Sequence, residues 1–154
     1  MSNFNAIDLL KVLKATSLGS SGLFAGAAIY CSYVQHPALM VASPKEMVNQ
    51  FQVFFPRAAT MQAALAVTSV IATVGATYLT KRQIFLIPAG LFGGTFAFTM
   101  LSIKPVYNQL LSMKVNNPSP NVESLIRSWG EKHFVRTILS TVGFGVLLFE
   151  VCRN

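Results

Sequence analysis

The sequence predicts an all-α protein, a bundle of four transmembrane helices with a short extra helix in the loop before the last span. Composition is the first reason: 53% of the 154 residues are hydrophobic and 11% are charged, whereas soluble domains carry about 25% charged residues. Second, uncharged apolar runs recur along the chain, and a membrane helix needs about 20 such residues. Third, these runs lack the two-residue alternation of barrel strands, so helices are the structure that leaves no backbone group unpaired in lipid.

Two spans are expected in the first half of the chain. No Lys, Arg, Asp or Glu occurs between Lys14 and Lys45, and the apolar part of this run predicts a first span at about 13–34. The apolar region of a signal peptide is only about 7–15 residues long, so we expect this run to be a retained span. The second span, at about 58–80, ends at Lys81.

Two further spans are expected in the second half. The third, at about 84–103, ends at Lys104. The uncharged run 137–149 is short for a span, but its flanking residues extend the fourth span to about 134–151. Together the four spans predict a single integral membrane domain, residues 1–154.

The connections between the spans are unequal in length. A tight turn around Arg82 joins the second span to the third, whereas segments 36–56 and 104–136 form long connections. With four spans, both long connections lie on one side of the membrane, and the termini and the tight turn lie on the other.

The charge distribution favours lipid as the main partner. The net charge is +7, from 12 Lys and Arg against 5 Asp and Glu. The positive residues lie singly or in pairs at the ends of apolar runs, which predicts contact with lipid headgroups and no nucleic-acid partner. Cys31 and Cys152 have no CxxC spacing and predict neither a disulfide framework nor a metal site.

Most unusual polar and aromatic residues fall on the side of the long connections. Because the prolines beside them cannot donate a hydrogen bond to a helix, the helices are expected to kink or stop there. The residues are His36 at the end of the first span, Phe55 and Arg57 at the start of the second, and Lys104, Tyr107 and Asn108 at the end of the third.

The segment before the last span adds a second polar group. Pro120 is typical of the first position of a helix. The helix that follows places Trp129, Lys132, His133 and Arg136 at relative positions 0, 3, 4 and 7. At 3.6 residues per turn these four side chains share one face.

Two interpretations of these residues remain open. An interfacial belt explains Lys104, Tyr107 and Lys132, because aromatic rings favour the headgroup layer and long cations extend into it. A belt explains His36 and His133 less well, since His is a poor membrane anchor. Polar groups near a span instead predict a functional pocket.

The order of several short motifs resembles a known family. These motifs are His36-Pro37-Ala38 after the first span, an aromatic–Pro56–Arg57 start to the second, Pro105-x-x-Asn108 after the third, and Trp129-x-x-x-His133-x-x-Arg136 before the fourth. From about Ala15 to Val151 the chain resembles a family of small four-span membrane proteins that includes the fungal anthrone oxygenases. The resemblance implies a four-helix fold. For a few members it implies oxidation of an anthrone to an anthraquinone by O2, with no metal and no organic cofactor.

The residue types suit this implied chemistry. Removal of the acidic C–H proton of an anthrone leaves a carbanion that reacts with O2. An imidazole, which titrates near neutral pH, suits the role of the base that removes this proton. A cation suits the developing oxyanion, and aromatic walls suit a flat substrate. We therefore expect His133 or His36 as the base and Arg136 as the oxyanion partner. The substrate-binding residues expected are Arg57, Lys104, Tyr107, Asn108, Trp129 and Phe55.

Two alternatives to this site are open. His36 and His133 with Glu131 or Glu46 would supply ligands for a non-haem iron. However, no HxH, HxxxH or ExxH spacing is present, so no metal is expected.

A non-catalytic accessory subunit, or a lipid-binding component of a larger membrane complex, would use the same cations for phospholipid headgroups or for a partner's acidic residues. Either function predicts a multi-pass integral membrane protein. Its expected ligand is a small lipophilic aromatic compound or a phospholipid headgroup.

Overall fold

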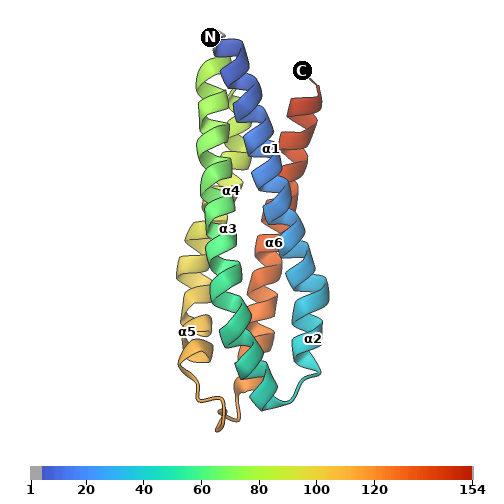
Figure 1. Ribbon diagram of the computed structural model, residues 1–154, viewed down its shortest axis with the longest axis vertical. Helices are drawn as coiled ribbons and strands as arrows, with labels where there is room; N and C mark the ends of the chain where they lie inside the picture. Colours follow the sequence, from blue (N-terminus) through green and yellow to red (C-terminus); the bar gives the residue numbers. More distant parts are fainter. Residues whose placement is uncertain (1–4, 154) are drawn as a thin grey trace.

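The computed structural model describes residues 5–153, and all the regular structure in this range is helical. Four long helical rods run along the long axis of the molecule (Figure 1). Each rod is long and apolar enough to cross a membrane, which confirms the predicted all-α, four-span architecture. The rods are Ala6–Met40, Pro44–Thr80, Gln83–Ser112 and Val122–Cys152.

The first and third rods each contain a turn of π-helix directly before a proline. Pro37 and Pro105 have no amide hydrogen to donate. The amide of the residue before each proline instead bonds five residues back, from His36 to the Cys31 carbonyl and from Lys104 to the Thr99 carbonyl. Each of these π-turns contains one residue more than an α-helical turn, and the helix continues past the proline without stopping.

These π-turns divide two rods into named segments. The first rod comprises α1 (Ala6–Tyr30), η1 (Cys31–Gln35) and α2 (His36–Met40), and the third comprises η2 (Gln83–Phe85), α4 (Leu86–Phe98), η3 (Thr99–Ile103) and α5 (Lys104–Ser112). The second and fourth rods are single helices, α3 (Pro44–Thr80) and α6 (Val122–Cys152).

The helices extend well beyond the predicted spans at the loop end. Helix α3 has 37 residues, or about 55 Å at 1.5 Å per residue, whereas the hydrocarbon layer is about 30 Å thick. The Ser43 hydroxyl and the Glu46 carboxylate form a capping box that starts α3 early. Only residues 41–43 and 113–121 of the two long connections are non-helical, and the segment predicted as an extra helix is continuous with the last span in α6. The lipid boundaries along these rods stay a prediction.

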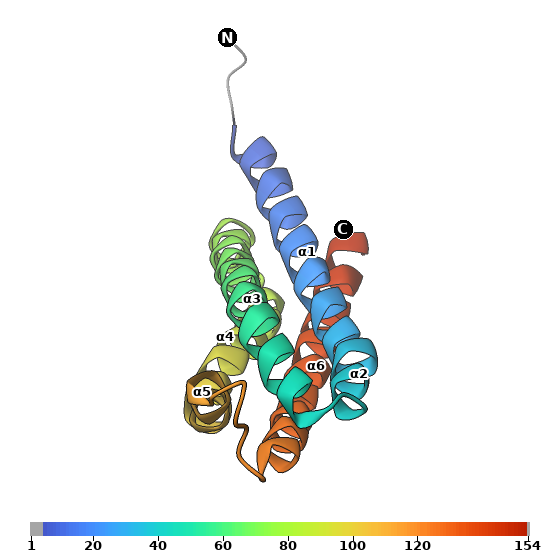
Figure 2. The same cartoon turned by 60° about the horizontal axis from the view of Figure 1, so that its bottom comes forward.

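The four rods pack as a ring. Helix α1 packs against α3 and α6, and α4 packs against the same two helices from the other side. The start of α1 and the end of α6 lie at one end of the bundle, and the connections from α2 to α3 and from α5 to α6 lie at the other (Figures 1 and 2). The long connections are thus on one side, as the sequence indicated.

The hydrophobic core is largest in the half of the bundle next to the long connections, here called the loop half. Its main cluster gathers large side chains from α3, η3 and α6, including Phe51, Phe55, Ile103 and Trp129. Toward the middle of the bundle the core narrows to a smaller cluster around Phe24 and Phe92, whose rings meet edge to face at 5.5 Å.

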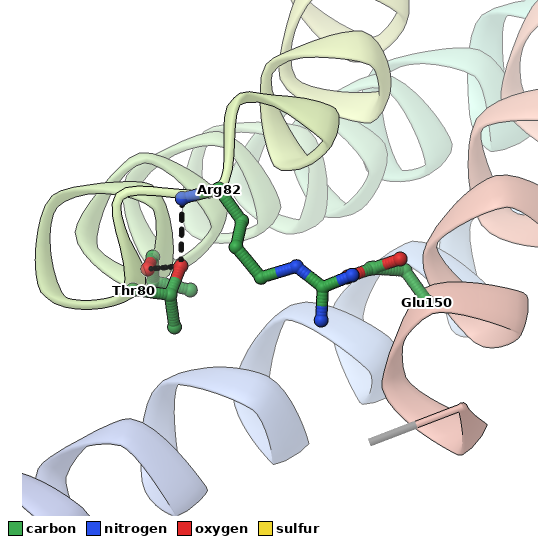
Figure 3. Close-up of polar contacts among 4 residues, drawn as sticks. Thr80, Arg82 and Glu150 are labelled. Carbon is green, nitrogen blue, oxygen red and sulfur yellow. Dashed lines mark hydrogen bonds and ion pairs between the residues drawn. The ribbon is translucent and has the colours of Figure 1, made fainter.

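An ion pair stabilises the opposite end of the bundle (Figure 3). Arg82, in the turn after α3, forms a 2.8 Å ion pair with Glu150 near the end of α6, whose side chain is 1% exposed. The Arg82 amide also donates to the Thr80 hydroxyl at 3.3 Å. The turn between the second and third rods is thereby tied to the fourth.

Candidate functional site

Trp129 is the centre of an aromatic cluster in the loop half. It is 2% exposed, and its indole stacks on the His133 imidazole with ring centroids 5.3 Å apart. Three α3 rings meet the indole edge to face, those of Phe51, Phe54 and Phe55 at 5.1, 5.9 and 6.2 Å. This packing joins α3 to α6 and sets the position of His133.

His36 lies directly against the backbone of α6. A Cβ atom at Gly130 would lie 2.1 Å from the His36 Nε2 atom, so the absence of a side chain there makes room for the imidazole. The His36 ring lies 6.1 Å from the Trp129 ring, measured between centroids. His36 and His133, the two predicted candidates for the base, therefore both adjoin one indole in the same half of the bundle.

Three ring nitrogens of this cluster are buried without a hydrogen-bond partner among residues 5–153. They are the Nε2 atoms of His36 and His133 and the Nε1 atom of Trp129. Buried polar atoms without a partner are rare in native proteins, and each costs about 1–3 kcal/mol. A bound ligand or ordered water at the cluster would remove this penalty.

Arg136 lies one helical turn beyond His133 and reaches toward α3. Its Nη2 atom donates to the Oε1 atom of Gln62 at 2.9 Å, and its guanidinium carbon is 5.6 Å from the centroid of the Phe24 ring. The Nε atom of Arg136 is buried and finds no partner in the described part of the chain. Because its hydrogen-bond partner is neutral, the arginine keeps its positive charge available to a ligand.

Arg136 and Gln62 line a cavity of about 290 Å³. The cavity opens on the flank of the bundle between α3 and the third rod, since Phe96 and Met100 in its wall are 55% and 37% exposed. Apolar walls with a few convergent polar groups are typical of small-molecule sites. The remaining wall residues are Phe24, Phe55, Ala59, Thr60, Ala63, Ala66, Thr95, Thr99 and Tyr107.

The structure divides the residues that the sequence singled out into three groups. The first group lines the cavity and comprises Arg136, Tyr107 and Phe55. The rings of Tyr107 and Phe55 lie 4.7 Å apart and form one aromatic wall. The second group, His36, His133 and Trp129, belongs to the aromatic cluster behind Phe55 and does not line the cavity.

The third group is not brought to the cavity. Arg57, Lys104 and Asn108 are exposed on the outer surfaces of α3 and α5. The Arg57 guanidinium donates to the carbonyl of Val53 on its own helix. Lys132, which the helical spacing placed with His133, donates to the Ser128 hydroxyl at 3.0 Å and lies beside the buried face.

Gln62 and Phe24 are two of the cavity residues that the sequence interpretation did not single out. Gln62 is 4% exposed and is the partner of Arg136. A signal for Gln62 was present, because it is the only amide side chain in the predicted second span and polar side chains in spans are functional candidates. Phe24 carried no such signal, since one aromatic residue among many in a span is not distinctive.

The carboxylates of the metal alternative do not join the two imidazoles. Glu46 accepts hydrogen bonds from the backbone and the hydroxyl of Ser43 at the start of α3. Glu131 is exposed on α6. Within residues 5–153, no three His, Cys, Asp or Glu side chains are grouped as ligands for a metal ion.

The fold and the cavity define a class of protein: a small four-helix protein, with helices long and apolar enough to cross a membrane, in which a half-buried arginine faces a largely apolar pocket on the flank. The family model for anthrone oxygenase matches residues 49–146, and the chain therefore belongs to the anthrone oxygenase family. The matched segment includes Phe55, Gln62 and Arg136 but not His36. The chain matches no curated protein and no solved structure.

Proposed function

We propose that the protein is a cofactor-free oxygenase that oxidises a flat, lipophilic aromatic substrate of the anthrone type in the cavity at Arg136. The observation that carries this proposal is the Arg136–Gln62 pair in a largely apolar cavity that opens on the flank of the bundle. A substrate dissolved in the membrane would reach such a cavity sideways, without crossing water.

The walls suit a planar ring system. Phe24, Phe55, Phe96 and Tyr107 offer aromatic faces from four different segments of the bundle. Aromatic rings prefer offset-stacked or edge-to-face contacts with other rings. We therefore place the substrate rings between these residues, with the substrate carbonyl toward the Arg136 guanidinium.

Arg136 would supply electrostatic stabilisation. When the C–H proton of an anthrone leaves, negative charge moves onto the carbonyl oxygen, and a guanidinium held in an apolar site favours this enolate. The enolate carbon then transfers electrons to O2 and bonds one of its oxygen atoms. The methylene loses both hydrogen atoms and becomes a carbonyl, and the second oxygen atom leaves as water, so one O2 is consumed per anthraquinone formed.

His133 is the proposed base of the two histidines. It lies one turn before Arg136 on α6, and its Nε2 atom is buried without a partner among the described residues. Because it does not line the cavity, we expect it to accept the proton through a bridging water. His36 lies beyond Trp129 and would be next in such a relay.

Turnover of anthrone by the full chain in lipid nanodiscs tests the proposal. Anthraquinone formation is followed by absorbance against a protein-free control that corrects for autoxidation. We expect Arg136→Gln to lower kcat about 10²–10³-fold, the usual effect of removing an oxyanion donor. Arg127→Gln is the matched control, because Arg127 is exposed on the same helix and pairs only with Glu123 among the contacts described for its side chain. A wild-type rate equal to the protein-free rate would refute the oxygenase function.

The base assignment has a separate test. We expect His133→Gln to lower kcat about 10²–10⁴-fold, as for loss of a general base. Undiminished anthrone turnover by the double variant His36→Gln/His133→Gln would eliminate both histidines from the mechanism and leave only the role of Arg136.

The second candidate function is lipid binding without catalysis, as in an accessory component of a membrane complex. The observation in its favour is the same arginine, since guanidinium groups bind phosphate well and Arg136 faces a cavity open to the flank. Phospholipid that co-purifies with the wild type and is lost in Arg136→Gln, together with no anthrone turnover, would select this function.

A further inference from the structure

A second hollow lies along the outside of the bundle next to the cavity. It is an apolar groove of about 220 Å³ between α3 and α4. Val67, Val70 and Ile71 line it from α3, and Phe92 and Gly93 line it from α4. No charged residue lines the groove, so its chemistry differs from that of the cavity at Arg136.

The groove and the cavity adjoin each other. Ala66 of α3 and Phe96 of α4 line both of them. From Ala66 to Ile71 the groove continues about 8 Å along α3, at 1.5 Å per residue, toward the end of the bundle that carries the termini. All the polar side chains of the two linings therefore belong to the cavity, and the adjoining groove is purely apolar.

A ligand that fills both parts must therefore have a polar group at the Arg136 end and an apolar group at the groove end. We propose that the substrate carries an apolar tail, with its ring system against Arg136 in the cavity and its tail in the α3–α4 groove. This inference rests on the proposed function and names the substrate class more closely, as an alkyl- or prenyl-bearing aromatic ketone. A tail that leaves the cavity between Ala66 and Phe96, the two residues common to both linings, would enter the groove.

Gly93 gives a direct way to block the groove. Gly93 lines the groove, and a Cβ atom added there meets no heavy atom within 4 Å, so a side chain can start at this position without a clash at Cβ. Gly94 is its matched control. It is the next residue of α4, its added Cβ also meets nothing within 4 Å, and it lines neither the groove nor the cavity.

The test measures binding of two product-like probes, anthraquinone itself and an anthraquinone that bears a linear octyl chain. Trp129 is the only tryptophan of the chain. It adjoins Phe55 in the cavity wall, so quenching of its fluorescence reports the bound quinone. Wild type, Gly93→Leu and Gly94→Leu are compared in nanodiscs of one lipid composition, which keeps the partitioning of each probe into lipid the same for every variant.

We expect Gly93→Leu to bind anthraquinone like the wild type and to bind the octyl compound about tenfold more weakly or worse, because tail and side chain would overfill one space. Gly94→Leu should bind both probes like the wild type. If Gly93→Leu weakens both probes equally, or neither, the tail proposal is wrong although the cavity at Arg136 stands. If the wild type binds neither probe, the proposed function fails and this inference fails with it.

Discussion

The contact between Gly130 and His36 gives the sharpest prediction for stability. An alanine at position 130 would place its Cβ atom 2.1, 2.3 and 2.5 Å from three atoms of the His36 imidazole. Contacts that short do not occur, so the ring must move out of its position against Trp129. We expect Gly130→Ala to destabilise the protein, because overfilling a packed site costs about 1–3 kcal/mol.

A smaller effect acts in the opposite direction. Alanine in place of glycine stabilises a helix interior by about 0.5–1 kcal/mol. At the middle of these two ranges the net loss expected for Gly130→Ala is about 1 kcal/mol, or a fall in Tm of about 2–4 °C for a chain of this size. Gly145→Ala is the matched control on the same helix. Its added Cβ meets nothing within 4 Å, so only the helix gain applies and Tm should rise slightly.

The assay is thermal unfolding of the purified protein in nanodiscs, followed by the fluorescence of Trp129. His36→Ala removes the imidazole that the new methyl group would strike, so in that background Gly130→Ala should no longer destabilise. An equal loss of Tm with and without His36 would refute the reasoning, because the two residues would then act independently.

Three further predictions concern the rest of the fold. Glu150→Ala should lower the stability of the protein by about 1–2 kcal/mol in the same thermal assay. This is less than the 3–5 kcal/mol lost when a fully buried ion pair is broken, because the Arg82 side chain is 33% exposed and is hydrated once its partner is gone. An unchanged Tm would contradict this. Gln52→Leu removes an amide that donates to the carbonyls of residues 110, 111 and 113, so hydrogen exchange in α5 should become faster while that in α1 stays the same. Ser43→Ala breaks the capping box of α3 and should lower stability by about 0.5–2 kcal/mol, whereas Ser112→Ala, a change at an exposed hydroxyl, should have little effect.

At the proline positions the structure shows that the helices do not stop, which local sequence patterns left undecided. A proline inside a helix removes one hydrogen bond, and the sequence therefore suggested that the helices kink or stop at Pro37 and Pro105. In the structure the loss is absorbed by one π-turn at each site. Packing of both widened segments against α6 stabilises the continued helix, and such packing between distant segments has no signature in a local pattern.

The candidate site shows the same distinction. The helical spacing correctly places Trp129 and His133 on one face of α6, because both are fixed by 3.6 residues per turn. Spacing does not reveal that Arg136 reaches across to Gln62, since that contact joins residues 74 positions apart. Nor does it reveal that Arg57, Lys104 and Asn108 turn outward.

By itself, the sequence determined the helical fold class and the number of long helical rods. Too few charges and four long apolar runs predict four helices that are long and apolar enough to cross a membrane, and the structure has them. The tertiary structure alone decided which polar side chains meet, because the rotation of each helix is set by how Phe55, Gly130 and Trp129 pack against their neighbours. That packing directs Arg136 into an apolar cavity and leaves both histidines behind its wall.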